Sequence, residues 1–177
     1  MDRKELARRI YDSSHLTGEF LLRSGAISNE YFDKYQFESD PELLYEICKH
    51  LSNIISNDFD VLAGLEMGGI PIATVLAQIM HKPVCFVRKK AKEYGTCKLA
   101  EGVDVKGKKL LVVEDVITSG GQVVLSTKDL REKGAIITNA VCVIDRESSG
   151  VENLKDIGVE LHSLFTMSEI KSLLDSY

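Results

Sequence analysis

The stretch that decides the fold reads LLVVEDVITSGGQ and runs from Leu110 to Gln122. Its first four residues, Leu110 to Val113, are apolar and predict a short buried strand. Two carboxylates, Glu114 and Asp115, follow, and then a turn rich in hydroxyl groups and glycine. A helix is expected directly after the turn, from about Gln122 to Lys133. A strand, a tight turn and a helix in this order form the repeating unit of an α/β fold.

Short apolar runs alternate with helical patterns along most of the chain. Further strands are expected at Val61–Gly64, Val84–Val87, Ile136–Ile144 and Val159–Phe165, with a shorter one at Glu19–Leu22. Helices are expected at Asp2–Ser13, Pro41–Ile55, Ile70–Met80 and about Met167–Leu174. This alternation predicts a mostly parallel central sheet flanked by helices. In such sheets ligands bind beyond the carboxyl ends of the strands, so the segments that follow the strands are expected to carry the chemistry.

The composition is that of an ordinary globular protein. The 177 residues are expected to form one domain, and the net charge of −5 gives no general attraction for nucleic acid or anionic membranes. No apolar run has the length of a bilayer, and the charged first dozen residues do not resemble a signal peptide. The cysteines form no C-x-x-C pair, and Cys48, Cys85 and Cys142 lie in apolar stretches. We therefore expect a reduced, cytoplasmic protein.

The turn after Asp115 has the chemistry of a phosphate site. Backbone N–H groups at the start of a helix bind phosphate, and glycines let that backbone approach closely. Thr118 and Ser119 add hydroxyl donors. Two carboxylates beside a phosphate would repel it unless they meet sugar hydroxyls or a metal carried by the ligand. The stretch is not a Walker A loop. An acidic strand end followed by an ordinary helix cap is the alternative.

Val112 to Gly121 resembles the PRPP-binding signature of type I phosphoribosyltransferases, which has apolar residues, two acids, two more apolar residues and then Thr-Ser-Gly. PRPP is the pyrophosphate-activated ribose phosphate that these enzymes use. The resemblance implies the type I phosphoribosyltransferase fold. It also implies that the two acids hold the ribose hydroxyls and that the turn holds the 5′-phosphate. The PRPP-binding residues that it implies here are Glu114, Asp115, Val116, Ile117, Thr118, Ser119, Gly120, Gly121 and Gln122.

A basic run, RKKAKEYGT, follows the second expected strand of the sheet and spans Arg88 to Thr96. On composition alone it could be a solvated loop. It also resembles the mobile catalytic loop of orotate phosphoribosyltransferases. That resemblance implies PRPP contacts from Arg88, Lys89, Lys92 and Tyr94, with Arg88 and Lys92 catalytic together with Asp115. Because loop residues in the family reach the neighbouring subunit's site, the resemblance also implies a homodimer.

The segment from Gly64 to Pro71 connects the first strand of the sheet to its helix. A glycine-flanked turn at a helix start is a second place for phosphate or pyrophosphate, and a tight βα turn is the alternative reading. The family has its pyrophosphate loop here, which implies PRPP contacts from Met67 and Gly68. Bacterial members often carry lysine where Gly68 stands, so the backbone is expected to make the contact in this chain.

The first forty residues or so resemble the small N-terminal hood of the orotate enzymes, so the single domain of residues 1–177 is expected to include it. By this resemblance Arg23, in place of the usual lysine, meets PRPP, and Tyr31 and Phe32 lie against the base. Aromatic rings suit a flat heterocycle, although two adjacent aromatics more often mean ordinary packing.

Asp145 and Arg146 end the fourth strand of the expected sheet, and such a pair can be a local ion pair. A fixed guanidinium would also recognise the carboxylate of orotate in a planar, two-pronged way. The surrounding residues resemble orotate-specific members, in which this arginine and the equivalent of Thr118 hold the base.

The resemblance therefore implies transfer of ribose 5-phosphate from PRPP to orotate, with Mg²⁺ carried by PRPP and no dedicated metal site on the protein. A purine-base transferase of the same fold, or a PRPP-binding regulator, are the alternatives.

Overall fold

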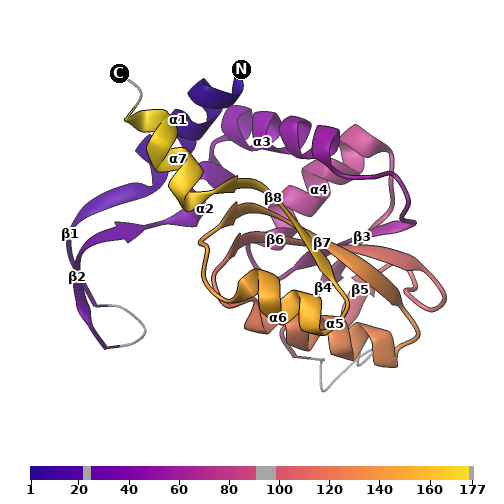
Figure 1. The fold of residues 1–177 in the computed structure, drawn as a ribbon. Coiled ribbons are helices and arrows are strands. Elements are labelled where there is room, and N and C mark those ends of the chain that lie inside the picture. The colour runs from indigo at the N-terminus through magenta and orange to yellow at the C-terminus, as the bar shows by residue number, and fades with distance from the viewer. Residues whose placement is uncertain (22–24, 91–98, 176–177) are drawn as a thin grey trace.

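A twisted, mostly parallel sheet forms the centre of the protein (Figure 1). The computed structural model describes residues 1–21, 25–90 and 99–175. Within those ranges six strands pair in the order β5-β4-β3-β6-β7-β8, and only β5 runs antiparallel to its neighbour. Their bounds are β3 Val61–Leu65, β4 Val84–Val87, β5 Ala100–Gly102, β6 Lys109–Ile117, β7 Ile136–Asp145 and β8 Glu160–Thr166. This confirms the predicted α/β class.

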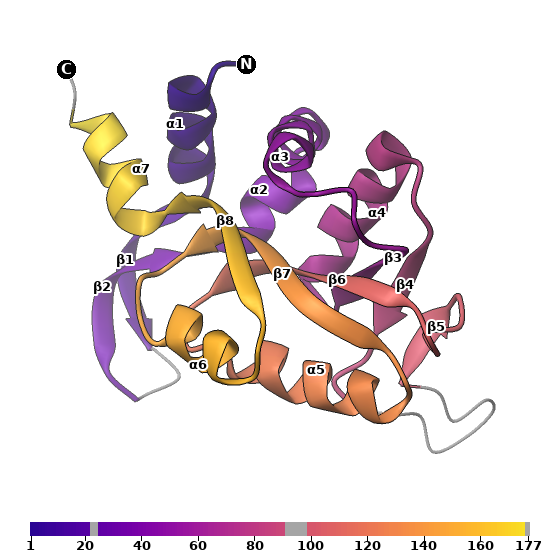
Figure 2. The same cartoon turned by 45° about the vertical axis from the view of Figure 1, so that its right-hand side comes forward.

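Helices cover both faces of this sheet (Figures 1 and 2). Alternate side chains of β6 point to opposite faces, so Leu111 and Val113 join one apolar core while Leu110 and Val112 join the other. On the first face lie α1 Arg3–Ser14, α3 Pro41–Ile54 and α4 Gly69–Met80, with α7 Met167–Leu174 near the sheet edge. On the second face lie α5 Gly121–Glu132 and α6 Gly150–Asp156. Burial on both faces explains the near-continuous apolar runs of the strands.

A β-hairpin extends away from this body beside α7 (Figure 1). Its strands, β1 His15–Leu21 and β2 Ile27–Phe32, are antiparallel, and the short helix α2 Lys34–Ser39 follows at once. Asp33 separates the hairpin from α2 and caps the helix, since its carboxylate accepts a hydrogen bond from the Tyr35 backbone N–H at 3.2 Å. The hairpin is where the sequence places the hood.

Several elements differ from the expectations. Strand β6 runs on to Ile117, so Glu114 and Asp115 lie within the strand and not after it. Strand β1 begins at His15 and not at Glu19. The elements β2, α2, β5 and α6 were not predicted, because each is short and shows no clear apolar period. Among the described helices, none is long and apolar enough to cross a membrane.

Candidate active site

The turn between β6 and α5 presents the start of a helix to solvent. Gly120 has a left-handed backbone (φ 69°), and a Cβ there would come within 2.5 Å of Leu154 Cδ1, so the position needs glycine. Helix α5 begins at Gly121, and among the described residues no side chain caps it. Asn153 donates a hydrogen bond to the Ser119 carbonyl oxygen at 2.9 Å and holds the turn in place. The first-turn amides are thus placed to bind an anion.

The turn between β3 and α4 lies directly beside it. Strands β3 and β6 are paired neighbours, and their carboxyl ends therefore reach the same edge of the sheet. A Cβ on Gly69 would come within 2.1 Å of the Val113 carbonyl oxygen, and one on Gly68 within 1.6 Å of Asp115 Oδ2. Position 68 therefore excludes any side chain while Asp115 keeps its place. The Met67 side chain is 60% exposed.

Asp115 and Glu114 have different surroundings although they are adjacent. The Asp115 side chain is fully buried and forms an ion pair with Lys34, whose Nζ lies 2.7 Å from Oδ2 and donates a hydrogen bond to Oδ1 at 2.9 Å. Glu114 is partly exposed, and its Oε1 accepts a hydrogen bond from the Asp115 backbone N–H at 3.0 Å. Of the two acids, only Glu114 is accessible as the structure stands.

Close packing of carboxyl groups shifts the pKa values of the ionisable side chains at this edge of the sheet. Burial, and then the negative charge of Asp115, raise the pKa of Glu38 to about 9. Burial, and then the same charge, raise the pKa of Glu114 to about 8. For Lys34, burial alone would lower the pKa, but the hydrogen bond and charge of Asp115 raise it overall. Perturbed groups gathered at a strand end are a common feature of functional sites.

The beginning of the basic run lies at the same edge. The Lys89 backbone N–H donates to Glu66 Oε1 at 2.9 Å, which ties the run to the β3–α4 turn. Arg88 Nε lies 3.4 Å from Glu101 Oε1 of the antiparallel strand β5. Three residues with predicted PRPP contacts, Arg23, Lys92 and Tyr94, lie outside the described residues.

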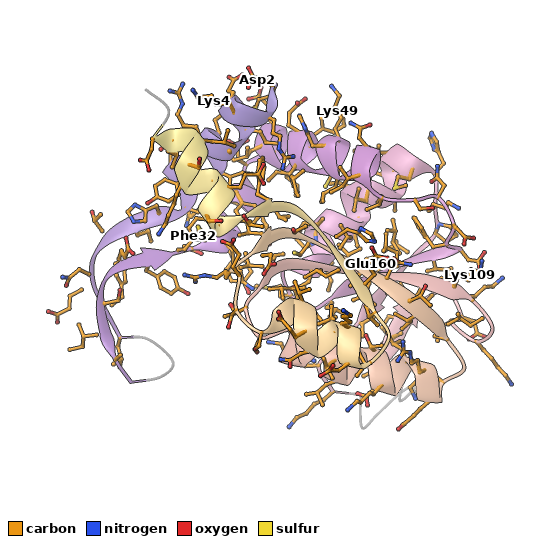
Figure 3. All side chains as sticks on the ribbon, viewed as in Figure 1. Asp2, Lys4, Phe32, Lys49, Lys109 and Glu160 are labelled. Atoms are coloured by element: carbon orange, nitrogen blue, oxygen red, sulfur yellow. The ribbon has the colours of Figure 1, made fainter. Side chains whose placement is uncertain are left out.

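Arg146, Tyr31 and Phe32 line one cavity of about 60 Å³, so the structure brings three of the four predicted orotate contacts together. The side chains that complete its wall are Tyr11, His15, Glu30, Met167 and Lys171. Figure 3 shows Phe32 at the hairpin end of the sheet, while Lys109 and Glu160 lie towards the opposite end.

The Arg146 backbone N–H donates to the Ile117 carbonyl oxygen at 2.9 Å, which places Thr118, the fourth predicted contact, at the neighbouring strand end. Among the described ion pairs Arg146 is not the partner of Asp145, whose Oδ1 accepts from the Glu147 backbone N–H at 2.9 Å. A local Asp145–Arg146 ion pair therefore does not account for this arginine.

Two residues at the site were missed from the sequence. Lys34 and Glu38 belong to α2, a six-residue helix with little apolar pattern, and they reach Asp115 from far away in the chain. The one local signal was Asp33, an N-cap residue directly after the Tyr31-Phe32 pair.

The model of the phosphoribosyl transferase domain matches residues 36–163 of the chain. The chain belongs to the phosphoribosyltransferase family. Among curated relatives, an orotate phosphoribosyltransferase of Nocardioides is 48% identical over 165 residues, which are 93% of this chain and 92% of the relative. One of Methanocaldococcus jannaschii is 41% identical over 155 residues, 88% of each chain. Within the family, the chain therefore belongs with the orotate phosphoribosyltransferases.

Solved structures agree with this placement. The orotate phosphoribosyltransferase of Aeropyrum pernix superposes with a TM-score of 0.84 at 31% identity, covering 96% of this chain and 97% of that one. The enzyme of Mycobacterium tuberculosis in complex with PRPP has a TM-score of 0.80 at 26% identity, covering 97% and 99%.

Proposed function

We propose that this protein transfers ribose 5-phosphate from PRPP to orotate, giving orotidine 5′-monophosphate and pyrophosphate on the route to UMP. The bond between ribose C1 and the pyrophosphate oxygen breaks, a bond from C1 to orotate N1 forms, and N1 gives up its proton. The observation that carries this proposal is the pair of amide-lined turns at the ends of β3 and β6 with Arg146 at the end of β7. The relatives named above support the choice of orotate.

The chain would hold PRPP by its two ends. The amides from Thr118 to Gln122 suit the 5′-phosphate, and those of the Met67–Gly68 turn suit the pyrophosphate. Arg88 and Lys89 lie next to that second turn and would offset the charge that builds up on the leaving group. Because the reaction needs no nucleophilic side chain, the residues act by positioning and by charge.

Orotate would lie against Tyr31, Phe32 and Arg146, which line one cavity. The guanidinium of Arg146 suits the carboxylate of the base, and the rings suit its flat faces. The base would then lie next to Thr118 and the ribose site.

Mg²⁺ is part of the proposal as a companion of PRPP. Among the described residues no group of three His, Cys, Asp or Glu side chains could hold a metal ion. The partly exposed Glu114 carboxylate at the site is a hard oxygen donor of the kind that Mg²⁺ accepts. It would contact an ion held mainly by the phosphate oxygens of PRPP, and the ion would supply charge neutralisation of the pyrophosphate.

A homodimer with a shared basic loop is also proposed. The protruding hairpin exposes Leu21 (79%) and Ile27 (67%), an apolar surface that a second copy could cover. Mixing Lys92→Ala chains with Arg146→Ala chains tests the sharing. At orotate concentrations well below the raised KM of Arg146→Ala, each variant alone is expected to have little activity, and hybrid dimers regain activity because one site then has both residues intact. A mixture no more active than its parts would contradict the shared loop.

Buried, unpaired Cys48, Cys85 and Cys142 suit the proposed cytoplasmic location.

An assay of base consumption tests the function itself. The protein is mixed with PRPP, Mg²⁺ and, in turn, orotate, uracil, adenine or hypoxanthine, and base and pyrophosphate are followed. Orotate alone is expected to be consumed with equal release of pyrophosphate. Consumption of a purine and not orotate would favour the purine transferase, and PRPP binding without turnover would favour the regulator.

A further inference from the structure

Helix α2 contributes two ionisable side chains to the PRPP edge of the sheet. Lys34 forms an ion pair with the fully buried Asp115, and it is itself only one-third exposed. Glu38 lies one turn along the same helix and is also buried. Positions four residues apart share one face of a helix, so both side chains face β6.

The contacts of Glu38 and Asp115 call for a proton between them. Glu38 Oε1 is buried and accepts no hydrogen bond from any described residue, whereas the buried Asp115 Oδ2 has the Lys34 Nζ 2.7 Å away. Lys34 Nζ also donates a hydrogen bond to the other oxygen of Asp115, Oδ1, at 2.9 Å. Two carboxylates that meet away from water cannot both stay charged at low cost. The ionisable groups around Glu38 are Asp115 and Glu114 of β6 and Lys34 of its own helix.

The charge of the Asp115 carboxylate affects the binding of PRPP. PRPP is a polyanion, and Asp115 lies beneath both proposed phosphate turns, against Gly68 on one side and next to Glu114 on the other. An uncompensated carboxylate there would repel the pyrophosphate. Gly68 packs against the Asp115 carboxylate, so a shift of that carboxylate would displace the β3–α4 turn.

We propose that Lys34 and a protonated Glu38 are positioning residues that fix the Asp115 carboxylate and cancel its charge, so that the two phosphate turns keep the spacing PRPP requires. The proposal rests on the proposed function for the identity of the ligand. It also links the two halves of the site, because α2 directly follows Phe32, which lines the base cavity. Movement of the hood hairpin would then displace Lys34 and, through its ion pair with Asp115, the PRPP turns.

The test compares Lys34→Met, Lys34→Arg and Glu38→Gln with the wild type, and Lys109→Met serves as the matched control. Lys109 also forms a 2.8 Å ion pair from β6, with Asp58, but in solvent at the far end of the strand. PRPP affinity by calorimetry and kcat/KM for PRPP are measured from pH 6 to pH 10, with the folded fraction checked by circular dichroism.

Lys34→Met is expected to lose on the order of 10- to 100-fold in PRPP affinity at pH 8. Lys34→Arg should recover most of the affinity, and Lys109→Met should match the wild type. Glu38→Gln should keep activity at neutral pH and should lack the decline near pH 9 that is expected of the wild type, since an amide can donate to Asp115 but does not ionise.

Two results would overturn the proposal: PRPP affinity of folded Lys34→Met within two-fold of the Lys109→Met control, or a Lys34→Arg variant that binds PRPP no better than Lys34→Met. Should Lys34→Met not fold, Glu38→Gln decides alone, and an unchanged alkaline decline would refute the role of Glu38. Calorimetry with PRPP needs no base, so failure of this inference is separate from failure of orotate turnover in the wild type.

Discussion

The two ends of strand β6 carry ion pairs of nearly equal length in opposite settings. At its start, Lys109 lies 2.8 Å from Asp58, and both side chains are more than half exposed. Near its carboxyl end, Asp115 lies 2.7 Å from Lys34 and is fully buried. The first pair is screened by water and contributes little. Beside the second pair lie two further carboxyl groups, Glu38 and Glu114, and burial, followed by the charge of Asp115, raises the pKa of each. Burial, more than distance, distinguishes the functional end of the sheet.

The largest effect is expected from Gly68→Ala, which would drive a methyl group into the Asp115 carboxylate. Displacing the carboxylate or the turn should lower kcat/KM for PRPP on the order of 100-fold or more. Gly158→Ala is the control, because that glycine is left-handed (φ 70°) with no atom within 4 Å of the new methyl group. It should cost only about 1 kcal/mol of stability and leave kinetics unchanged. Equal kinetics for the two variants would show that Asp115 is not fixed by Gly68.

Arg146→Ala removes the guanidinium from the base cavity without touching either phosphate turn. The KM for orotate should rise on the order of 10- to 100-fold, because an ionic hydrogen bond to the carboxylate is lost. The KM for PRPP should change little, and steady-state kinetics with each substrate varied in turn measures both. Equal rises would argue against a contact between Arg146 and orotate.

Two glutamates with raised pKa values make stability depend on pH in a defined direction. The pKa values of Glu38 (about 9) and Glu114 (about 8) exceed the 4.5 of an ordinary glutamate. The folded state therefore binds more protons than the unfolded state between these limits, so stability falls as pH rises from about 5 to 9. The Tm of Glu38→Gln should fall less over that range than the wild-type Tm, by several degrees. Parallel Tm curves would contradict the buried, protonated Glu38.

The smallest effect is expected from Lys109→Met at the solvent end of β6. Loss of an exposed ion pair should shift the Tm by no more than about 1–2 °C and leave kcat unchanged. Thermal melts in low and high salt check this, because salt should remove even that difference. A Tm drop as large as that of Lys34→Met would erase the contrast between the two ends.

The sequence predicted the parts of this comparison that depend on local pattern. The apolar run Leu110 to Val113 and the turn at Gly120 predicted a strand, a glycine turn and a helix, all of which the structure contains, while phosphate binding at the turn stays a prediction. Arg146, Tyr31 and Phe32 were grouped only through resemblance to a family, and their roles stay predictions.

The partners of Asp115 could not be predicted in the same way. Lys34 and Glu38 lie in a short helix without apolar period, and their burial depends on a strand 81 positions away from Lys34. Nothing in the sequence distinguishes the exposed Asp58 from the buried Asp115, since burial comes from tertiary packing. The three-residue strand β5 was not predicted for the same reason, because Ala100 to Gly102 become a strand only by pairing with β4.

The most direct test of the account is a crystal structure of the protein with PRPP and Mg²⁺. The account predicts the 5′-phosphate on the backbone amides between Thr118 and Gln122, the ribose hydroxyls beside Glu114 and the pyrophosphate at the Met67–Gly68 turn. PRPP bound elsewhere, with these amides still in contact with solvent, would contradict it.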